Sequence, residues 1–309
     1  MKITFTIDSE LREKLDGVTG NPLFWDTYRL IKEASKRGHE VRVVQSEDAV
    51  VGNGFSQEFY LDKGIEASNG FTTPDVLFIR GYGMRVDKNC FNNLVDTVKS
   101  IESKIPLVIN SGETTAFSRK DKQKTLPLPF IPSHRINNVS DIKNLLNKHK
   151  EGLILKPDYG LQSIGVGYVG SEKDLENLLE QGVISEQALL NDYSAEKFIV
   201  DKREIRYIHL FGDMIGSRIA DKTGEPGKEE LGARYLNTNS NEKHLEIVRR
   251  AIDLTGSKFG CVDFRGDNIL EINGSGTQTF YRTGVGGGKE FLDFTSDILD
   301  SVERKYGEL

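Results

Sequence analysis

The sequence predicts an α/β fold that begins with a parallel sheet and continues into two smaller α+β units. Over the first 112 residues, short apolar runs alternate with amphipathic stretches, which is typical of parallel strands joined by helices. Three prolines within residues 126–132 then predict an extended connector. Beyond it, hairpin patterns replace the alternation. A chain of 309 residues is long enough for two or three such units.

The N-terminal unit is predicted to span residues 1–112. Asn21 and Pro22 suit the cap and the first position of a helix. Ligands bind at the carboxyl ends of parallel strands, so Asp8, Arg80 and Asn110 are candidate binding residues, with loop capping as the alternative. The elements expected here are strands at 2–7, 39–44, 74–80 and 106–110, and helices from Asn21 to Gly38 and near 88–103.

The central unit, residues 113–195, contains an apolar strand that carries one lysine, Lys156. A lysine in such a strand is unfavourable unless an anion pairs with it. A glycine-bearing loop follows at 158–164, and glycines let a backbone approach phosphate closely. The sequence therefore predicts that Lys156 holds phosphate oxygens, with a plain hairpin as the alternative. Further elements expected here are a helical turn at 118–124, a helix capped by Ser140 and a strand at 186–190.

The C-terminal unit, residues 196–309, opens with a hairpin that turns at Gly212-Asp213. This hairpin places Arg218 inside an apolar strand, where a guanidinium requires an anionic partner. A salt bridge to a local acid and a transferring phosphoryl group are both compatible with that position. A final helix is expected at 289–304.

A second hairpin, residues 262–273, turns around Gly266. If Phe264 faces Leu270 across this turn, Asp263 faces Glu271, and Asn273 shares the face of Glu271. Two carboxylates and an amide oxygen on one patch favour a hard cation, best Mg²⁺, which takes its other ligands from water and substrate phosphates. Solvated acids on a surface hairpin are the alternative.

Composition excludes several classes of protein. The chain carries 41 Lys and Arg against 47 Asp and Glu, and no basic block, so we expect no nucleic-acid partner. No apolar run reaches membrane-spanning length, and the first residues form a strand pattern rather than a signal peptide. Cys90 and Cys261 are far apart and have no metal-binding spacing, which predicts free thiols and a cytoplasmic location.

The order of these stretches resembles the ATP-grasp superfamily over essentially the whole chain. Arg37-Gly38-His39-Glu40-Val41 after the opening strand is similar to bacterial glutathione synthetase. Lys156 with the segment Gly160-Leu-Gln-Ser-Ile-Gly165 is similar to the ribosomal-protein glutamate ligases. The resemblance implies an N-terminal parallel-sheet domain plus two small α+β subdomains that enclose ATP.

The resemblance also implies site residues and cofactors. ATP phosphates would contact Lys122, Lys156, Gly160, Gln162, Ser163 and Gly165; adenine would lie at Glu196, Phe198 and Ile199, and ribose at Glu204. Mg²⁺, or Mn²⁺ in its place, would be held by Asp263, Glu271 and Asn273. Arg218 would face the acyl phosphate, with Arg206 and Arg282 completing the catalytic set.

The implied activity is an ATP-dependent carboxylate–amine ligase that forms an amide through an acyl phosphate and releases ADP and phosphate. The implied partners are a small acid and an amine, the acceptor being an amino acid, a peptide or a carrier protein, and homo-oligomers are usual in such proteins. An ATP-grasp kinase and a non-catalytic nucleotide-binding protein are the alternatives. The segment 274–284 departs from the Ser-Pro loop of glutathione synthetases, so the acceptor is left open.

Overall fold

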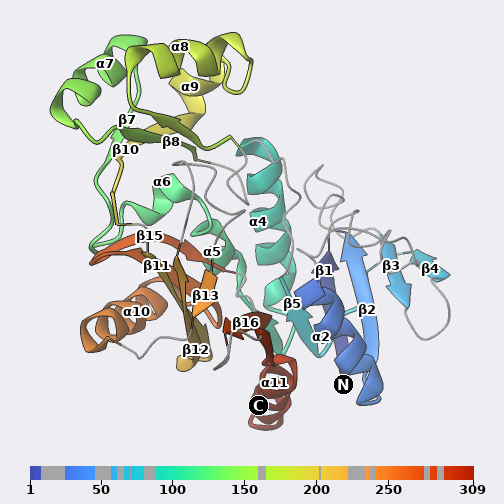
Figure 1. Cartoon of the computed structure of the whole chain (residues 1–309). Coiled ribbons are helices and arrows are strands. Elements are labelled where there is room, and N and C mark those ends of the chain that lie inside the picture. The colour runs from blue at the N-terminus through green and yellow to red at the C-terminus, as the bar shows by residue number, and fades with distance from the viewer. Residues whose placement is uncertain are drawn as a thin grey trace.

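Three main sheets organise the chain, and they follow one another in sequence (Figure 1). The structure is a computed structural model. It describes residues 1–7, 25–45, 57–60, 66–69, 71–79, 88–158, 165–201, 203–221, 234–236, 241–274, 279–283 and 289–309.

The N-terminal sheet has the strand order β4-β3-β2-β1-β5-β6. Strands β2, β1, β5 and β6 are parallel, which confirms the predicted α/β alternation, while β3 and β4 add an antiparallel edge. The elements are β1 Lys2–Ile7, α2 Trp25–Lys36, β2 Glu40–Gln45, β3 Gln57–Tyr60, β4 Glu66–Asn69, β5 Val76–Phe78, α4 Lys88–Glu102 and β6 Leu107–Ile109.

The central sheet is antiparallel, with the order β7-β10-β8-β9, and helices α7, α8 and α9 lie above it in Figure 1. Strand β8, which carries Lys156, pairs with β9 as the predicted hairpin. The elements are α5 Gly112–Ala116, α6 Lys120–Gln123, β7 Ser133–Arg135, α7 Val139–Lys148, β8 Leu153–Pro157, β9 Gly167–Val169, α8 Glu172–Glu180, α9 Glu186–Asp192 and β10 Tyr193–Lys197.

The C-terminal sheet has the order β13-β12-β11-β14-β15, and α10 packs on one of its faces. Both predicted hairpins, β11–β12 and β14–β15, are present. The elements are β11 Arg203–Leu210, β12 Asp213–Asp221, β13 Arg234–Leu236, α10 Glu242–Thr255, β14 Phe259–Arg265, β15 Asn268–Asn273, β16 Thr279–Thr283, β17 Lys289–Asp293 and α11 Thr295–Gly307.

Four local expectations were wrong. Residues 186–190 form a helix, because Ser185 caps it by accepting a hydrogen bond from the Ala188 amide. Helix α7 is capped by Asn138 rather than Ser140. Residues 289–293 form strand β17 before α11 begins. Phe264 pairs with Ile269, because an irregularity in the β14–β15 register follows Asp263.

One hydrophobic core joins the N-terminal sheet to the C-terminal part of the chain. Side chains of β1 and α2 pack with Ile298, Leu299 and Val302 of α11 and with Phe259 at the start of β14. Hydrophobic burial of this kind is the main favourable term in holding two units together. The N-terminal domain and the C-terminal sheet are therefore packed on each other rather than merely linked.

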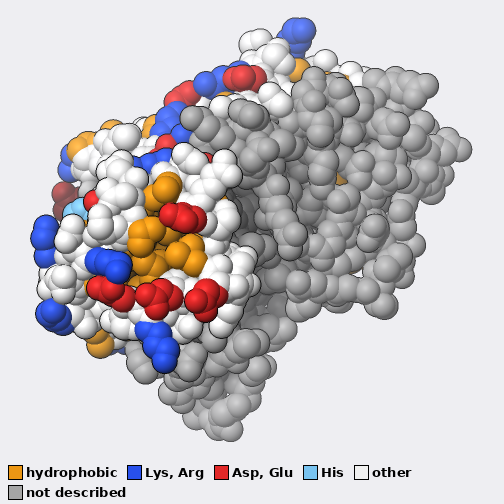
Figure 2. Space-filling model, turned by 90° about the horizontal axis from the view of Figure 1, so that it is seen from above, with side chains coloured by type: hydrophobic (Ala, Val, Ile, Leu, Met, Phe, Trp, Pro, Cys, Tyr) orange, Lys and Arg blue, Asp and Glu red, His pale blue; other side chains and the backbone are white. Residues whose placement is uncertain are grey.

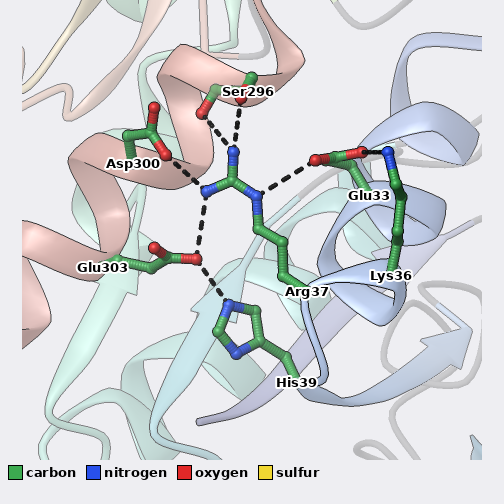
Figure 3. A network of polar contacts seen from close by, with 7 residues as sticks. All are labelled: Glu33, Lys36, Arg37, His39, Ser296, Asp300 and Glu303. Atoms are coloured by element: carbon green, nitrogen blue, oxygen red, sulfur yellow. Dashed lines mark hydrogen bonds and ion pairs between the residues drawn. The ribbon is translucent and has the colours of Figure 1, made fainter.

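Polar contacts of Arg37 reinforce the packing of α2 on α11 (Figure 3). The guanidinium donates to Asp300 at 2.6 Å, to Glu303 at 3.2 Å and to the Ser296 hydroxyl at 2.6 Å. His39 shares Glu303 at 2.7 Å. The segment that resembles glutathione synthetase thus connects the N-terminal domain to the last helix, far along the chain.

His209 is fully buried in β11, and neither of its ring nitrogens has a hydrogen-bond partner in the part of the chain that the structure describes. Burial lowers the pKa of His209 from 6.5 to about 4. Between pH 6.5 and pH 4, His209 is protonated in the unfolded chain but remains neutral in the folded chain. The free energy of unfolding therefore decreases as the pH falls from 6.5 toward 4. We expect a loss of about 2 kcal/mol between pH 7.5 and pH 5 from this group.

Urea unfolding of His209→Leu and wild type at both pH values measures this contribution. Between pH 7.5 and pH 5, the free energy of unfolding should decrease by about 2 kcal/mol less in the variant than in wild type. Equal losses in the two proteins would show that His209 does not carry the pH dependence.

The face seen in Figure 2 carries an apolar patch bordered by both acidic and basic side chains, over its described part. Within the described ranges, no helix combines the length and the apolar character needed to cross a lipid bilayer.

Candidate functional site

Four charged residues stand in one row across the C-terminal sheet. Arg218 of β12 is the register partner of Arg206 of β11, Arg206 is the partner of Asp263 of β14, and Asp263 is the partner of Glu271 of β15. Cross-strand partners share a face, and neighbouring strands lie about 4.8 Å apart. The backbone therefore brings two predicted metal ligands and two predicted catalytic arginines onto one line, although the side chain of Arg218 lies outside the described part.

Arg206 and Asp263 form a buried two-point ion pair. The Arg206 Nε and Nη2 atoms donate to the two carboxylate oxygens of Asp263 at 2.5 and 2.6 Å, and Asp263 is 1% exposed. Burial raises the pKa of Asp263, and the charge of Arg206 opposes that rise. Arg206 is thus engaged with a predicted metal ligand, an arrangement that holds the carboxylate in a fixed orientation.

Glu271 and Asn273 complete the predicted metal site. The Asn273 amide donates to Glu271 Oε1 at 2.9 Å and to Asp263 Oδ2 at 3.1 Å, so the three side chains converge. Burial alone would raise the pKa of Glu271, but the charges of Lys120, Lys156 and Arg206 and the bond from Asn273 lower it to about 2. Two ionised carboxylates beside an amide fit a hard divalent cation.

The backbone around Asn273 requires a glycine at position 260. A Cβ atom on Gly260 would lie 2.4 Å from the carbonyl oxygen of Asn273. No other residue type fits so close an approach between β14 and the end of β15.

Lys120 is the site residue that the sequence analysis missed. Burial lowers the pKa of Lys120, the attraction of Glu271 raises it, and the nearby charge of Lys156 lowers it again. The predicted phosphate contact, Lys122, donates instead to Glu113 at 2.6 Å, with its ammonium 4.3 Å from the Phe117 ring centre. The assignment of Lys122 stays a prediction, and the geometry favours Lys120.

Helical spacing explains why Lys120, rather than Lys122, turns toward β15. Lys120 and Gln123 are three residues apart on α6, so they share a face, whereas Lys122 points elsewhere. Gln123 is buried against β15 while Lys122 remains partly exposed. A buried polar residue on one face of a short helix indicates which lysine turns inward.

Lys156 meets a carboxylate rather than open solvent. Its ammonium donates to Glu196 Oε2 at 2.6 Å, and Lys124 lies 2.7 Å from the other oxygen of Glu196. Burial would raise the pKa of Glu196, but the two lysines lower it below its ordinary value. Glu196, expected beside adenine, is therefore the counter-ion of two lysines. A phosphate group could take the same place beside either of them.

Several solved structures share the fold of this chain. The chain is similar to the ATP-grasp ligase PsnB complexed with minimal precursor, at 15% identity over 98% of both chains with a TM-score of 0.63. The chain has the ATP-grasp fold. It is likewise similar to the macrocyclase MdnC from Microcystis aeruginosa MRC, at 13% identity over 89% of this chain and 92% of that chain with a TM-score of 0.57. No family model and no curated protein matches the sequence.

A third structural neighbour is D-alanyl-alanine synthetase A from Vibrio cholerae O1, at 15% identity over 100% of this chain and 99% of that chain with a TM-score of 0.59. PsnB has also been solved with Mg and ADP. The predicted resemblance is thereby confirmed at the level of the fold.

The remaining predicted positions are distributed over the ATP-grasp subdomains. Phe198 packs edge-on against Tyr168 with ring centres 5.3 Å apart, and Ile199 is half-buried beside it. Glu204 lies 3.9 Å from Arg265. Arg282 is the register partner of Glu290, with its side chain outside the described part. Gly165 has a φ of 76°, while the other predicted loop residues, Gly160, Gln162 and Ser163, lie outside the described residues.

Asn110, a candidate ligand at the end of β6, has an internal role in the ATP-grasp fold. It is fully buried, and its amide group donates to the carbonyl oxygens of Phe259, at 2.7 Å, and Gly274. Its Oδ1 accepts from the amides of Lys258 and Phe259 at 3.1 and 3.2 Å. This side chain links the N-terminal sheet to both ends of the β14–β15 hairpin. Its contacts fit the loop-capping alternative rather than a ligand-binding role.

Proposed function

We propose that this chain is an ATP-dependent carboxylate–amine ligase. The observation that carries the proposal is the charged row of Arg218, Arg206, Asp263 and Glu271, with Lys120 and Lys156 close enough to shift the pKa of Glu271. Acids that gather a divalent cation, facing lysines that pair with anions, form a site for a nucleoside triphosphate.

In the proposed reaction, the γ-phosphoryl group of ATP passes to a carboxylate oxygen of the acid, giving an acyl phosphate and ADP. The amine nitrogen then attacks the acyl carbon and forms the C–N bond. The C–O bond to phosphate breaks, phosphate leaves with its electron pair, and the nitrogen loses a proton. No nucleophilic side chain is needed, because the acyl phosphate is itself the activated group.

The chain's own residues would bind and orient the reactants. Lys120 and Lys156 would pair with phosphate oxygens, and Asp263, Glu271 and Asn273 would hold Mg²⁺, or Mn²⁺ in its place. Mg²⁺ supplies positive charge to the phosphate oxygens when bound. Glu196, now bound to Lys156, would be displaced toward Lys124 as a phosphate takes its place.

Arg218 would stabilise the charge of the reacting phosphoryl group and the oxyanion formed by amine attack. Its backbone position in the row is in register with Arg206 and lies two strands from Asp263. Arg206 lies between them and is held by Asp263, so we assign it to orienting the carboxylate.

Two variants should separate the rate of ADP formation from the affinity for the nucleotide. Arg218→Met should lower the rate of ADP formation about a hundredfold or more while changing the affinity for Mg·AMPPNP little. Lys156→Met should weaken Mg·AMPPNP about tenfold or more, measured by calorimetry. Lys143→Met, which removes an exposed ion pair with Glu172, is the matched control and should change neither value. Normal turnover in Arg218→Met would contradict its role.

The substrates are proposed more broadly. PsnB is complexed with a minimal precursor and MdnC with the precursor peptide MdnA. These names support a peptide acceptor for this chain, and D-alanyl-alanine synthetase A supports an amino acid. The proposal also includes a cytoplasmic location and a homo-oligomeric state.

A screen for ADP formation with amino acids, peptides and other amines, added singly and in pairs, tests the proposal. A ligase forms ADP only when both an acid and an amine are present. ADP formation with a single hydroxyl compound would instead establish a kinase. Absence of Mg·AMPPNP binding by wild type would refute the nucleotide site itself.

A further inference from the structure

One edge of the C-terminal sheet is closed by a segment from the central part of the chain. Strand β15 is last in the sheet order, so none of the strands that the structure describes lies along its outer edge. The backbone of 129–131 occupies part of this edge: the Ile269 amide donates to the Pro129 carbonyl at 2.9 Å, and the Ile131 amide donates to the Ile269 carbonyl at 3.3 Å. Three residues further along β15, a side chain occupies the edge instead.

That side chain is Gln123, which satisfies both backbone polar groups of Ile272. Its Nε2 donates to the Ile272 carbonyl at 2.7 Å, and its Oε1 accepts from the Ile272 amide at 2.9 Å. A third bond runs from Nε2 to the Phe117 carbonyl at 2.8 Å, and Gln123 is 2% exposed. The side-chain amide thus makes the two bonds that an adjacent strand would make.

The Ile272 backbone, to which Gln123 is hydrogen-bonded, is next to the proposed metal ligands. Ile272 lies between Glu271 and Asn273, whose side chains point to the site. Lys120 lies three residues before Gln123 on α6, so the two side chains share the face of the helix that meets β15. One side chain therefore links the backbone that carries two metal ligands to the helix that carries a phosphate-binding lysine.

Helix α6 needs such an attachment. It has only four residues, and its N-cap, Arg119, makes no side-chain capping bond. A helix this short is not stable by itself, so contacts with the rest of the fold must fix its position. Gln123 makes the hydrogen bonds that hold α6 on β15.

We infer that Gln123 is a positioning residue that sets Lys120 against Glu271 and Asn273 for binding Mg²⁺ and triphosphate. The inference rests on the proposed function and extends it to a residue that touches neither ligand. Gln123 acts through Lys120, so its removal should matter only while Lys120 can bind phosphate.

The test is the affinity for Mg·AMPPNP, measured by calorimetry on the full chain. Gln123→Met keeps the volume of the side chain and removes all three hydrogen bonds. We expect it to weaken binding about tenfold. Thr114→Val is the matched control: Thr114 is 3% exposed and its hydroxyl donates to the carbonyls of Thr255 and Gly256 at the C-terminal end of α10. It should lower the melting temperature and leave the affinity unchanged.

A double-mutant cycle separates positioning from general damage. Lys120→Met alone should weaken binding, and adding Gln123→Met to it should have little further effect, within about twofold. Fully additive losses would overturn the inference, as would unchanged affinity in Gln123→Met.

Two other outcomes are decisive. If wild type does not bind Mg·AMPPNP, the proposed function fails; if wild type binds and only Lys120→Met weakens binding, the positioning role alone fails. Should Gln123→Met not fold, Gln123→Glu keeps the bond from the Ile272 amide and should bind several-fold more weakly than wild type. If neither variant folds, Gln123 is a residue of general stability and the inference is overturned.

Discussion

A Glu271→Gln variant is expected to fold and to lose nearly all ATP turnover. The substitution conserves size, and Asn273 can still donate to the remaining side-chain oxygen of residue 271. It removes the charge that the pKa of about 2 keeps ionised at every physiological pH. Because this charge would hold a divalent cation and balance Lys120, we expect ADP formation to fall about a thousandfold, equivalent to about 4 kcal/mol of transition-state stabilisation.

The measurement is ADP formation with an acid–amine pair found in the screen, together with affinity for AMPPNP at increasing Mg²⁺. Glu246→Gln, an exposed position on α10, is the matched control and should behave as wild type. Circular dichroism confirms that the Glu271 variant is folded. Turnover within tenfold of wild type would remove the metal site from this hairpin.

The largest expected effect on stability comes from Asn110→Ala. The variant loses four hydrogen bonds to buried backbone groups and puts alanine at a φ of 67°. Unsatisfied buried groups cost about 1–3 kcal/mol each, and a left-handed backbone adds about 1 kcal/mol for a residue other than glycine. We expect a loss of about 4 kcal/mol in the free energy of unfolding, measured in urea.

Asn110→Gly divides this effect into its two causes. Glycine adopts the positive φ without strain but restores no hydrogen bond, so it should be about 1 kcal/mol more stable than the alanine variant. Asn147→Ala on the exposed side of α7 serves as the control and should change stability by less than about 0.5 kcal/mol. A loss below about 1 kcal/mol in Asn110→Ala would show that this connection does not hold the two sheets together.

Sequence reasoning worked best where one short segment contains its own pairing partner. The register of Asp263 on Glu271 follows from period-two alternation around a turn at Gly266, and the structure confirms it. The same reasoning missed the irregularity after Asp263, because strict alternation sets one residue opposite one, whereas a bulge sets two residues of one strand opposite one of the other.

Short apolar runs were ambiguous for a different reason. Residues 186–190 are compatible with a buried strand and with one side of a helix, and periodicity cannot separate the two over five residues. The Ser185 cap decides between them, since its hydroxyl accepts from the Ala188 amide only when the chain turns into a helix.

The sequence by itself determined the α/β order of the chain, the two hairpins and the pair of acids, because turn residues and alternation act over a few positions. Tertiary structure alone decided that Lys120 lies beside the acids and that Glu196 pairs with Lys156. It also decided that the buried side chains of Asn110 and Gln123 hydrogen-bond to distant backbone segments. Gln123 and Ile272 lie 149 residues apart, and so do Asn110 and Phe259. Which polar groups meet over such separations depends on how the sheets pack, and packing is set by the whole core rather than by any local pattern.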